Sequence, residues 1–281
     1  MPPLSSDEED GLPILAVTRE MGSLGTFIGQ DVARRLGYTF IRHQIVAEAA
    51  QVYETAEESL IATVESKPGP WEALSDAARR HFAFLASEVF DAALKDNVVI
   101  MGRWATLLLR GVDHALRVRV CAPMELRIQR IVERTGVGPE EARARIRRSD
   151  EGVRARIRQF FDVEWADPAL YDAVLTTDRL SVEAGADVLC HMLGRTEWQA
   201  TEASRATLQD AGLSARVRAA LKVTPETTRL NVKITCRGGR LQLAGTVETA
   251  VMREAAARVA AASPGVISVE NNLTVTGFPR W

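Results

Sequence analysis

Residues 14–37 constrain the fold more than any other stretch of the sequence. An apolar run at residues 14–18 leads into a loop that contains Gly22 and Gly25. A helical pattern then extends from Thr26 to Gly37, a residue suited to ending a helix. A strand, a glycine-containing loop and a helix in this order present backbone N–H groups and a helix N-terminus to a phosphate group. The loop contains no lysine, so the motif G-x-x-x-x-G-K-[ST] is absent. The sequence therefore predicts a phosphate-binding geometry without its usual charged residue.

Short apolar runs alternate with helical patterns through the first two thirds of the chain. After the first run, they occupy residues 38–41, 97–101, 116–121 and 171–176. This alternation is typical of an α/β fold in which a parallel five-stranded sheet is covered by helices on both faces. Ligands of such sheets bind beyond the carboxyl ends of the strands. We therefore expect functional groups in the segment 19–25, at Arg42 and at Gly102 and Arg103.

The chain divides into two predicted domains. Residues 1–11 are expected to be a disordered N-terminus, and residues 12–196 form the first domain. The polar, alanine-rich segment 197–208 is interpreted as a linker or a solvated helix. In residues 209–277, alternating apolar residues flank Gly238-Gly239, which indicates a β-hairpin, and helical patterns precede and follow it. This second domain is predicted to be a small α+β unit with the order αββαβ.

Composition excludes several functional classes. A hydrophobic content of 46% and a charged content of 26% are those of a soluble globular protein. The net charge of −2 gives no reason to expect nucleic-acid binding. No apolar run approaches the ~20 residues that span a bilayer, and no secretory signal is visible at the N-terminus. The three scattered cysteines are interpreted as free thiols, and a cytoplasmic location is expected.

The first domain resembles the cytidylate kinase-like family over residues 13–193. The resemblance is carried by seven segments in order, among them Thr18-Arg-Glu-Met-Gly-Ser-Leu-Gly, Val99-Ile-Met-Gly-Arg103 and Ile146-Arg-Arg-Ser-Asp150. It implies a P-loop kinase-like fold with a degenerate phosphate loop. It also implies nucleotide binding, with ATP and Mg2+ as cofactors, and transfer of the γ-phosphoryl group to a pyrimidine nucleoside monophosphate such as CMP.

The resemblance assigns roles to residues of this chain. Nucleotide binding falls to Arg19, Glu20, Gly22, Ser23, Gly25 and Thr26. Acceptor binding falls to Arg42, Gly102 and Arg103. Contacts to the transferring group, on a mobile arginine-rich segment, fall to Arg147, Arg148, Asp150 and Arg154. The four histidines lack the spacing of metal ligands, so no metal site built from histidines is predicted. Glu20 is the carboxylate best placed to hold Mg2+, directly or through water.

Four residues depart from the pattern of the family. Leu24 stands where relatives carry a second glycine, and Thr26 where they carry arginine. Arg42 and Trp104 each stand where relatives carry aspartate. A side chain at Leu24 is expected to obstruct phosphate approach or to require an unfavourable backbone angle. These changes leave two alternatives open: a catalytically inactive nucleotide sensor (a pseudokinase), and a scaffold that binds no nucleotide.

The second domain resembles a BON domain. The resemblance is carried by Leu243-Ala-Gly-Thr-Val247 and by Pro264-Gly-Val-Ile-Ser-Val-Glu-Asn-Asn-Leu-Thr-Val275. BON domains attach proteins to membrane surfaces or to partners. This one has no cluster of basic residues of the kind that binds anionic lipid. Binding of a protein partner or self-association is therefore expected rather than binding to a membrane.

Overall fold

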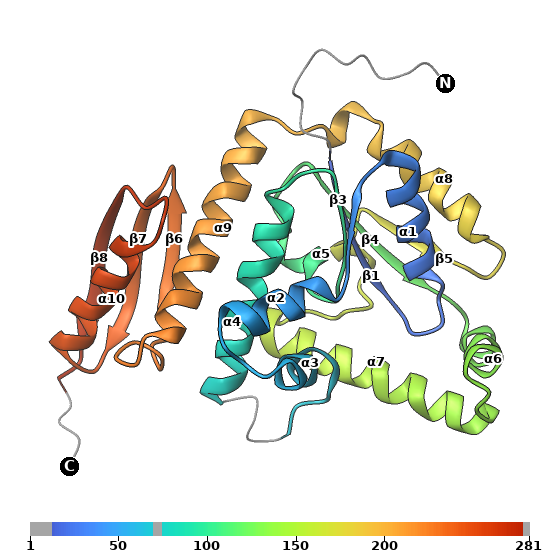
Figure 1. Ribbon diagram of the computed structural model, residues 1–281, viewed down its shortest axis with the longest axis horizontal. Helices are drawn as coiled ribbons and strands as arrows, with labels where there is room; N and C mark the ends of the chain where they lie inside the picture. The colour runs from blue at the N-terminus through green and yellow to red at the C-terminus, as the bar shows by residue number, and fades with distance from the viewer. Residues whose placement is uncertain (1–12, 70–74, 278–281) are drawn as a thin grey trace.

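A parallel sheet of five strands forms the centre of the first domain. The computed structural model describes residues 13–69 and 75–277, so the N-terminal segment predicted to be disordered lies outside the described residues. The strands are β1 (Ile14–Arg19), β2 (Thr39–Ile41), β3 (Val98–Met101), β4 (Ala115–Cys121) and β5 (Ala173–Thr176). Their order in the sheet is β2-β3-β1-β4-β5, with β1 at the centre between β3 and β4. The predicted fold class is confirmed (Figure 1).

Helices cover both faces of this sheet. On one face, α1 (Gly25–Leu36) and α8 (Val182–Leu193) bury residues such as Ile28, Val32 and Leu189 against β1, β3 and β4. The remaining helices of the domain, several of which cover the other face, are α2 (Gln44–Val52), α3 (Glu57–Glu65), α4 (Asp76–Ala93), α5 (Ala105–Leu108), α6 (Met124–Thr135) and α7 (Pro139–Phe161). Short 3-10 turns at Pro168–Leu170 and Thr196–Trp198 complete the domain.

The ends of α1 and α8 follow the local sequence. Gly37 ends α1 at a φ of 70°, in the left-handed region that glycine adopts without strain. The side chain of Ser181 accepts a hydrogen bond from the backbone N–H of Ala184, at 3.1 Å, and thereby caps the start of α8. The end of α1 at Gly37 was predicted, and both ends depend on single residues and their immediate neighbours.

The C-terminal domain has the predicted αββαβ order. It contains α9 (Glu202–Val223), β6 (Lys233–Arg237), β7 (Arg240–Val247), α10 (Ala250–Ala262) and β8 (Ser268–Val275). Strands β6 and β7 are antiparallel and joined by Gly238-Gly239, both of which have positive φ, as a tight hairpin requires. Strand β8 pairs parallel to β7. Among the described residues, no helix is both long and apolar enough to cross a bilayer.

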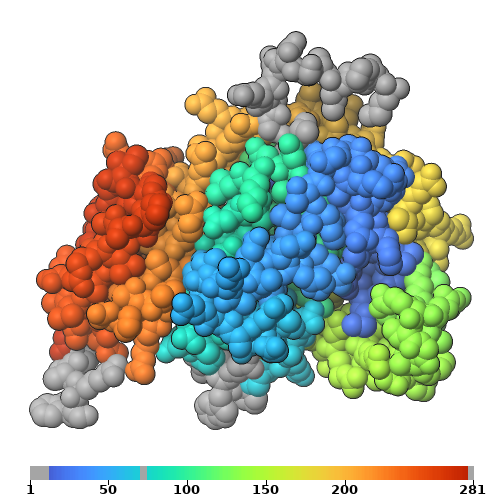
Figure 2. All heavy atoms as spheres, viewed as in Figure 1, coloured from blue at the N-terminus to red at the C-terminus, as the bar shows by residue number. Residues whose placement is uncertain are grey.

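The segment predicted as a linker is instead largely part of α9, a helix that belongs to both domains. Leu208, Ala215 and Ala219 pack in the core of the first domain, whereas Leu213, Val217 and Leu221 pack in the core of the second. Figure 1 shows α9 between the two sheets, and Figure 2 shows the C-terminal domain packed along the side of the first. Of the two interpretations of segment 197–208, a linker or a solvated helix, residues 202–208 are helical. The sequence did not show that this helix packs on both domains, because the stripe facing the first domain consists largely of alanine, which also suits a solvated surface.

A buried carboxylate on α4 makes stability depend on pH. Burial, together with nearby Asp91 and Glu48, raises the pKa of Glu88 from 4.5 to about 7. The folded protein therefore keeps a proton that the unfolded chain has released, and stability falls as the pH rises from 4.5 to about 7. Replacing Glu88 with glutamine removes this dependence. We expect the variant to be more stable than the natural protein by about 1–2 kcal/mol near pH 8 and nearly unchanged near pH 5, measured by urea unfolding. An equal change at both pH values would contradict the assignment.

Candidate functional site

The loop after β1 brings the start of α1 very close to the sheet. A Cβ atom on Gly25 would lie 2.8 Å from Cβ of Arg19 and 2.9 Å from Cβ of Val120. Gly22 has a φ of 81°, and a Cβ atom there would lie 3.0 Å from the carbonyl oxygen of Arg127. Both glycines are therefore required by close packing or backbone angle. The first intrahelical bond of α1 runs from the N–H of Phe27 to the carbonyl of Leu24, so the N–H groups of Gly25 and Thr26 at the helix start precede it.

Leu24 adopts the strained conformation that its sequence position suggested. It has a φ of 62° and a ψ of 4°, in the left-handed region, and it lines the cavity described below. A residue with a Cβ atom in this region costs on the order of 1 kcal/mol or more. The loop thus keeps the backbone path of a glycine while placing an apolar side chain beside the helix N-terminus.

Removing the Leu24 side chain is expected to open the loop to phosphate. We expect Leu24→Gly to raise the affinity for a nucleoside triphosphate by about 3–10-fold, since glycine suits the angle and leaves the amides uncovered. Leu24→Ala is the matched control: it also opens the loop but keeps the strain, so its stability should be lower than that of Leu24→Gly by about 1 kcal/mol. Affinities come from calorimetric titration and stabilities from urea unfolding. Unchanged affinity in both variants would show that Leu24 does not obstruct the site.

Arg130 on α6 holds the loop in place. It donates hydrogen bonds to the carbonyl oxygen of Gly22, at 3.2 Å, and to the Oγ1 and carbonyl oxygen of Thr177, at 2.9 and 2.7 Å. The hydroxyl of Thr177 in turn donates to the carbonyl oxygen of Ser23, at 2.9 Å. The loop is therefore pinned by the segment after β5 as well as by its own strand.

A set of buried ion pairs lies next to the loop. Glu20 contacts Arg119 at 2.7 Å and Arg127 at 3.2 Å. Arg127 also donates to both carboxylate oxygens of Asp150 on α7, at 2.9 and 2.8 Å. All four side chains are largely buried. This network connects the end of β1 with β4, α6 and α7 and supports the loop.

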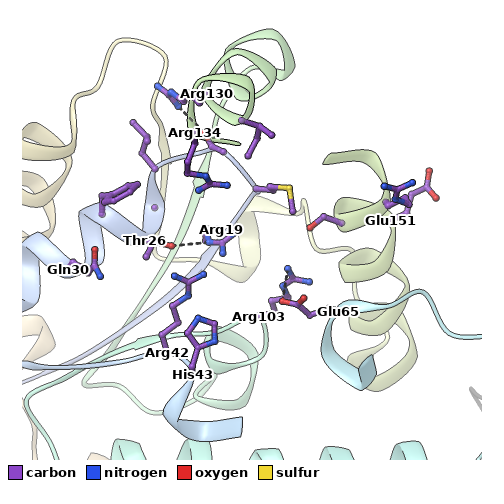
Figure 3. A pocket seen from close by; sticks show the side chains of 18 of the residues that line it. Arg19, Thr26, Gln30, Arg42, His43, Glu65, Arg103, Arg130, Arg134 and Glu151 are labelled. Atoms are coloured by element: carbon purple, nitrogen blue, oxygen red, sulfur yellow. Dashed lines mark hydrogen bonds and ion pairs between the residues drawn. The ribbon is translucent and has the colours of Figure 1, made fainter. Parts of the chain in front are cut away.

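A large cationic cavity opens beside the loop and the start of α1. Its volume is about 1140 Å³. Its cationic lining consists of Arg19, Arg42, Lys67, Arg103, Arg130, Arg134 and Arg148. The carboxylates Glu65, Glu133 and Glu151 are fewer, so the cavity carries an excess of positive charge. Figure 3 shows the guanidinium groups of Arg19, Arg42 and Arg134 converging on one space from different elements.

The positive charges of the arginines at the centre of this cavity are only partly balanced by carboxylates. Burial, followed by the neighbouring positive charges of Arg103 and Arg42, lowers the pKa of Arg19 to about 10. Burial also lowers the pKa of Arg103, although Glu65 lies 3.4 Å away. The Nη1 atom of Arg103 is buried and has no hydrogen-bond partner in the described part of the chain. Unpaired buried cations are costly, so an anion bound here would stabilise the protein.

A smaller, largely apolar cavity adjoins the cationic one. Its volume is about 260 Å³. Its walls include Ile45, Val46, Ile61, Val64, Val89 and Trp104, and Gly102 also lines it. It shares Arg19, Arg42, His43, Glu65 and Arg103 with the larger cavity, so these residues stand at the junction of the two. We call the smaller cavity the apolar lobe.

Comparison with known proteins decides the family. Residues 14–179, more than half of the chain, match the model of the cytidylate kinase-like family, and residues 209–277 match that of the BON domain. The chain belongs to the cytidylate kinase-like family. Both resemblances predicted from the sequence are confirmed, and the five-stranded domain is the cytidylate kinase-like domain.

Individual relatives agree with this family. The cytidylate kinase of Methanopyrus kandleri is 33% identical over 107 residues, which cover 35% of this chain and 55% of that protein. The cytidylate kinase of Pyrococcus horikoshii is 31% identical over 93 residues, which cover 33% and 47%. This chain thus spans about half the length of these relatives. An uncharacterised protein from Eubacterium ventriosum, with a TM-score of 0.50 and 18% identity, covers 65% of this chain and 99% of its own and supports the fold alone.

Most residues that the family resemblance assigned to nucleotide and acceptor binding meet at the two cavities. Arg19, Gly22, Gly25, Thr26, Arg42 and Arg103 line the larger cavity, and Gly102 lines the apolar lobe. Thr26 accepts a hydrogen bond from Nε of Arg19, at 3.1 Å. Ser23, within the loop, is fully buried, and its hydroxyl has no partner among the described residues.

The residues assigned to the transferring group all lie on α7, but of these four only Arg148 belongs to the described lining of the cavity. Arg148 lines the cavity, whereas Arg147 and Arg154 are exposed and are not among its described lining. Asp150 is bound to Arg127. The second half of α7 is also fixed to α3, because Nε of Arg156 donates to the carbonyl oxygen of Ser66 at 2.7 Å. In this structure the arginine-rich segment is therefore a packed helix.

The carboxylates nearest the loop do not suit direct metal binding. Both oxygens of Glu20 and both oxygens of Asp150 are engaged by arginines. No group of three or more His, Cys, Asp or Glu side chains suited to a metal occurs among the described residues. Glu20 and Asp150 therefore leave no free carboxylate oxygen for the Mg2+ that the cytidylate kinase-like family implies.

Several cavity residues were not predicted from the sequence, Lys67 and Glu65 among them. These two come from the end of α3 and the segment after it, and they reach the cavity because α3 packs against α7. The only signal in the sequence was Pro68-Gly69, which indicates that a helix ends before it but not what that helix faces. The tertiary position of this segment could not be derived from local pattern.

Proposed function

We propose that the cytidylate kinase-like domain binds a nucleoside triphosphate and positions it for phosphoryl transfer to an anionic acceptor. The observation that carries this proposal is the convergence of Arg19, Arg42 and Arg103 in one cavity beside the start of α1. Buried cations and free helix N-terminal amides together are suited to phosphates.

The residues would divide the work by position. The amides of Gly25 and Thr26, with Arg19, face the phosphates of the donor. Arg42 and Arg103, at the junction with the apolar lobe, hold the anionic group of the acceptor. Arg134 and Arg148 add positive charge from α6 and α7 across the cavity. In the reaction, the bond from the γ-phosphorus to the bridging oxygen breaks, and a bond to an acceptor oxygen forms. The products are a nucleoside diphosphate and the phosphorylated acceptor.

A nucleotide sensor without turnover is the second candidate. It is favoured by the strained Leu24 in the loop and by the engagement of Glu20 and Asp150 in ion pairs. Such a protein would use the same cationic cavity for binding, but the carboxylates of Glu20 and Asp150 would not be available to Mg2+.

An activity assay separates the two candidates. The full chain is incubated with ATP, Mg2+ and CMP, the acceptor that the family implies, and formation of ADP is followed against a sample without acceptor. ADP formed only with the acceptor supports phosphoryl transfer. ATP binding in calorimetry without ADP formation, both with CMP and with a smaller phosphate monoester such as phenyl phosphate, would support the sensor.

For the BON domain we propose contact with a protein partner or a second copy of the chain. The exposed face of its sheet is polar, with Thr235, Gln242 and Glu270 across its three strands. Such a face suits hydrogen bonding to protein better than insertion among lipid chains. Flotation of the full chain with anionic vesicles tests this, and recovery in the vesicle fraction would contradict it.

A further inference from the structure

The apolar lobe has a chemistry that a cytosine base would not match. Its inner walls are built by aliphatic side chains of β1, α2, α3 and α4 together with Trp104. Within the described residues, its lining contains no hydroxyl or amide side chain, and its charged groups are those shared with the cationic cavity. Apart from these shared groups, the side-chain N–H of its lining is that of Trp104, which is buried without a partner in the described part of the chain. A cytosine ring carries an amino donor and two acceptors. The Trp104 N–H could pair with only one of them, so the others would lose their water partners without regaining protein ones.

The lobe is also preformed. Trp104 is 4% exposed, and its ring lies 5.3 Å from that of Phe82 and 5.2 Å from that of Phe160. This aromatic packing holds Trp104 in place as part of the wall. A cavity of about 150 Å³ lined by aliphatic side chains holds a benzene molecule, so a lobe of about 260 Å³ has room for one ring with a short substituent.

The charge at the mouth of the lobe determines the other end of the ligand. Arg19, Arg42 and Arg103 line both cavities, and Nη1 of Arg103 is buried without a partner in the described structure. A phosphate group at this junction would satisfy that donor and offset the repulsion among the three cations.

From this juxtaposition we infer that the acceptor site takes a phosphate monoester with an apolar body about the size of one ring, rather than a cytidine nucleotide. This inference rests on the proposed function in treating the bound monoester as the acceptor, but the binding preference can be measured without turnover. The phosphate lies among the arginines, and the apolar body lies in the lobe against Trp104 and Ile61.

Calorimetric titrations of the full chain with phenyl phosphate, ribose 5-phosphate and CMP test this inference. Burying an apolar ring favours phenyl phosphate over ribose 5-phosphate by about 10–100-fold, and CMP should bind no more than about threefold more tightly than ribose 5-phosphate. Tighter binding of CMP than of phenyl phosphate, or no binding of any of the three, would overturn it.

Two variants locate the preference in the lobe. Ile61 is 38% exposed, so Ile61→Asn places an amide in the wall without emptying the core. It should weaken phenyl phosphate by about 10-fold and change ribose 5-phosphate by less than about threefold. Ile267→Asn, at a 73% exposed site on the BON domain, is the matched control and should change neither. Equal effects of the two variants on phenyl phosphate would refute the placement.

A separate titration with a non-hydrolysable ATP analogue keeps the two proposals distinct. If the analogue fails to bind while phenyl phosphate binds as expected, the proposed function fails and the preference of the lobe stands. If the analogue binds and CMP is preferred, the nucleotide site stands and the apolar-body inference fails.

Discussion

Replacing Arg103 with methionine is expected to weaken phosphate-monoester binding by about 10–100-fold and, at the same time, to stabilise the free protein. The loss in affinity follows because hydrogen bonds from a charged donor contribute about 1.5–3 kcal/mol each. The gain in stability follows because the variant removes a buried guanidinium whose Nη1 atom is unpaired and whose ion-pair partner, Glu65, is 58% exposed. Calorimetry with phenyl phosphate gives the affinity, and urea unfolding without ligand gives the stability.

The control for this variant is Arg147→Met on α7. Arg147 is exposed and is not part of the described cavity lining, so its removal should change affinity by less than about twofold. Similar losses for both variants would mean that affinity reflects the overall charge of the protein. Destabilisation by Arg103→Met would mean that Arg103 stabilises the fold and does not serve to bind an anion.

Replacing Arg127 with methionine is expected to cause the largest loss of stability, about 3–5 kcal/mol. Arg127 has a side chain that is 4% exposed and contacts Glu20 and Asp150. Its Nε also donates to the carbonyl oxygen of Met21 in the loop, at 2.7 Å. Without it, Asp150 loses its ion-pair partner, Glu20 keeps only Arg119, and the loop loses an anchor.

Removing the carboxylates together with the arginine tests the cause of that loss. The triple variant Arg127→Met, Glu20→Gln, Asp150→Asn should recover part of the stability in urea unfolding, since the two carboxylates that Arg127 compensates are then uncharged and Arg119 alone is left without its partner. If the single variant loses less than about 1 kcal/mol, the ion-pair network does not stabilise the loop and the surrounding fold as we describe. If the triple variant is no better than the single one, shape and not charge determines the loss.

The parts of the fold that depend on neighbouring residues were predictable from the sequence. The cap at Ser181, the left-handed Gly37 and the Gly238-Gly239 hairpin each follow from one or two residue types at a turn. The alternation of strands and helices then led to the parallel sheet and to the edge at which the arginines gather.

What could not be predicted depends on packing between distant segments. Helical periodicity alone did not show which arginine of α7 faces the cavity, and Arg148 lies there while Arg147 does not. The sequence around Glu20 gave no sign that arginines from β4 and α6 surround it. The sequence left open whether segment 197–208 is a linker or a solvated helix, because the contacts of α9 with the first domain and with the second sheet come from two different stripes.

The claim on which the account depends is that the loop after β1 and the surrounding arginines form one anion site. Calorimetric titration of the full chain with a non-hydrolysable ATP analogue, in the presence and absence of pyrophosphate, tests it most directly. We expect one analogue to bind per chain, with an affinity that falls when pyrophosphate competes and falls again in the variant Arg19→Met. An analogue that does not bind at millimolar concentration, or that binds equally well to Arg19→Met, would contradict it.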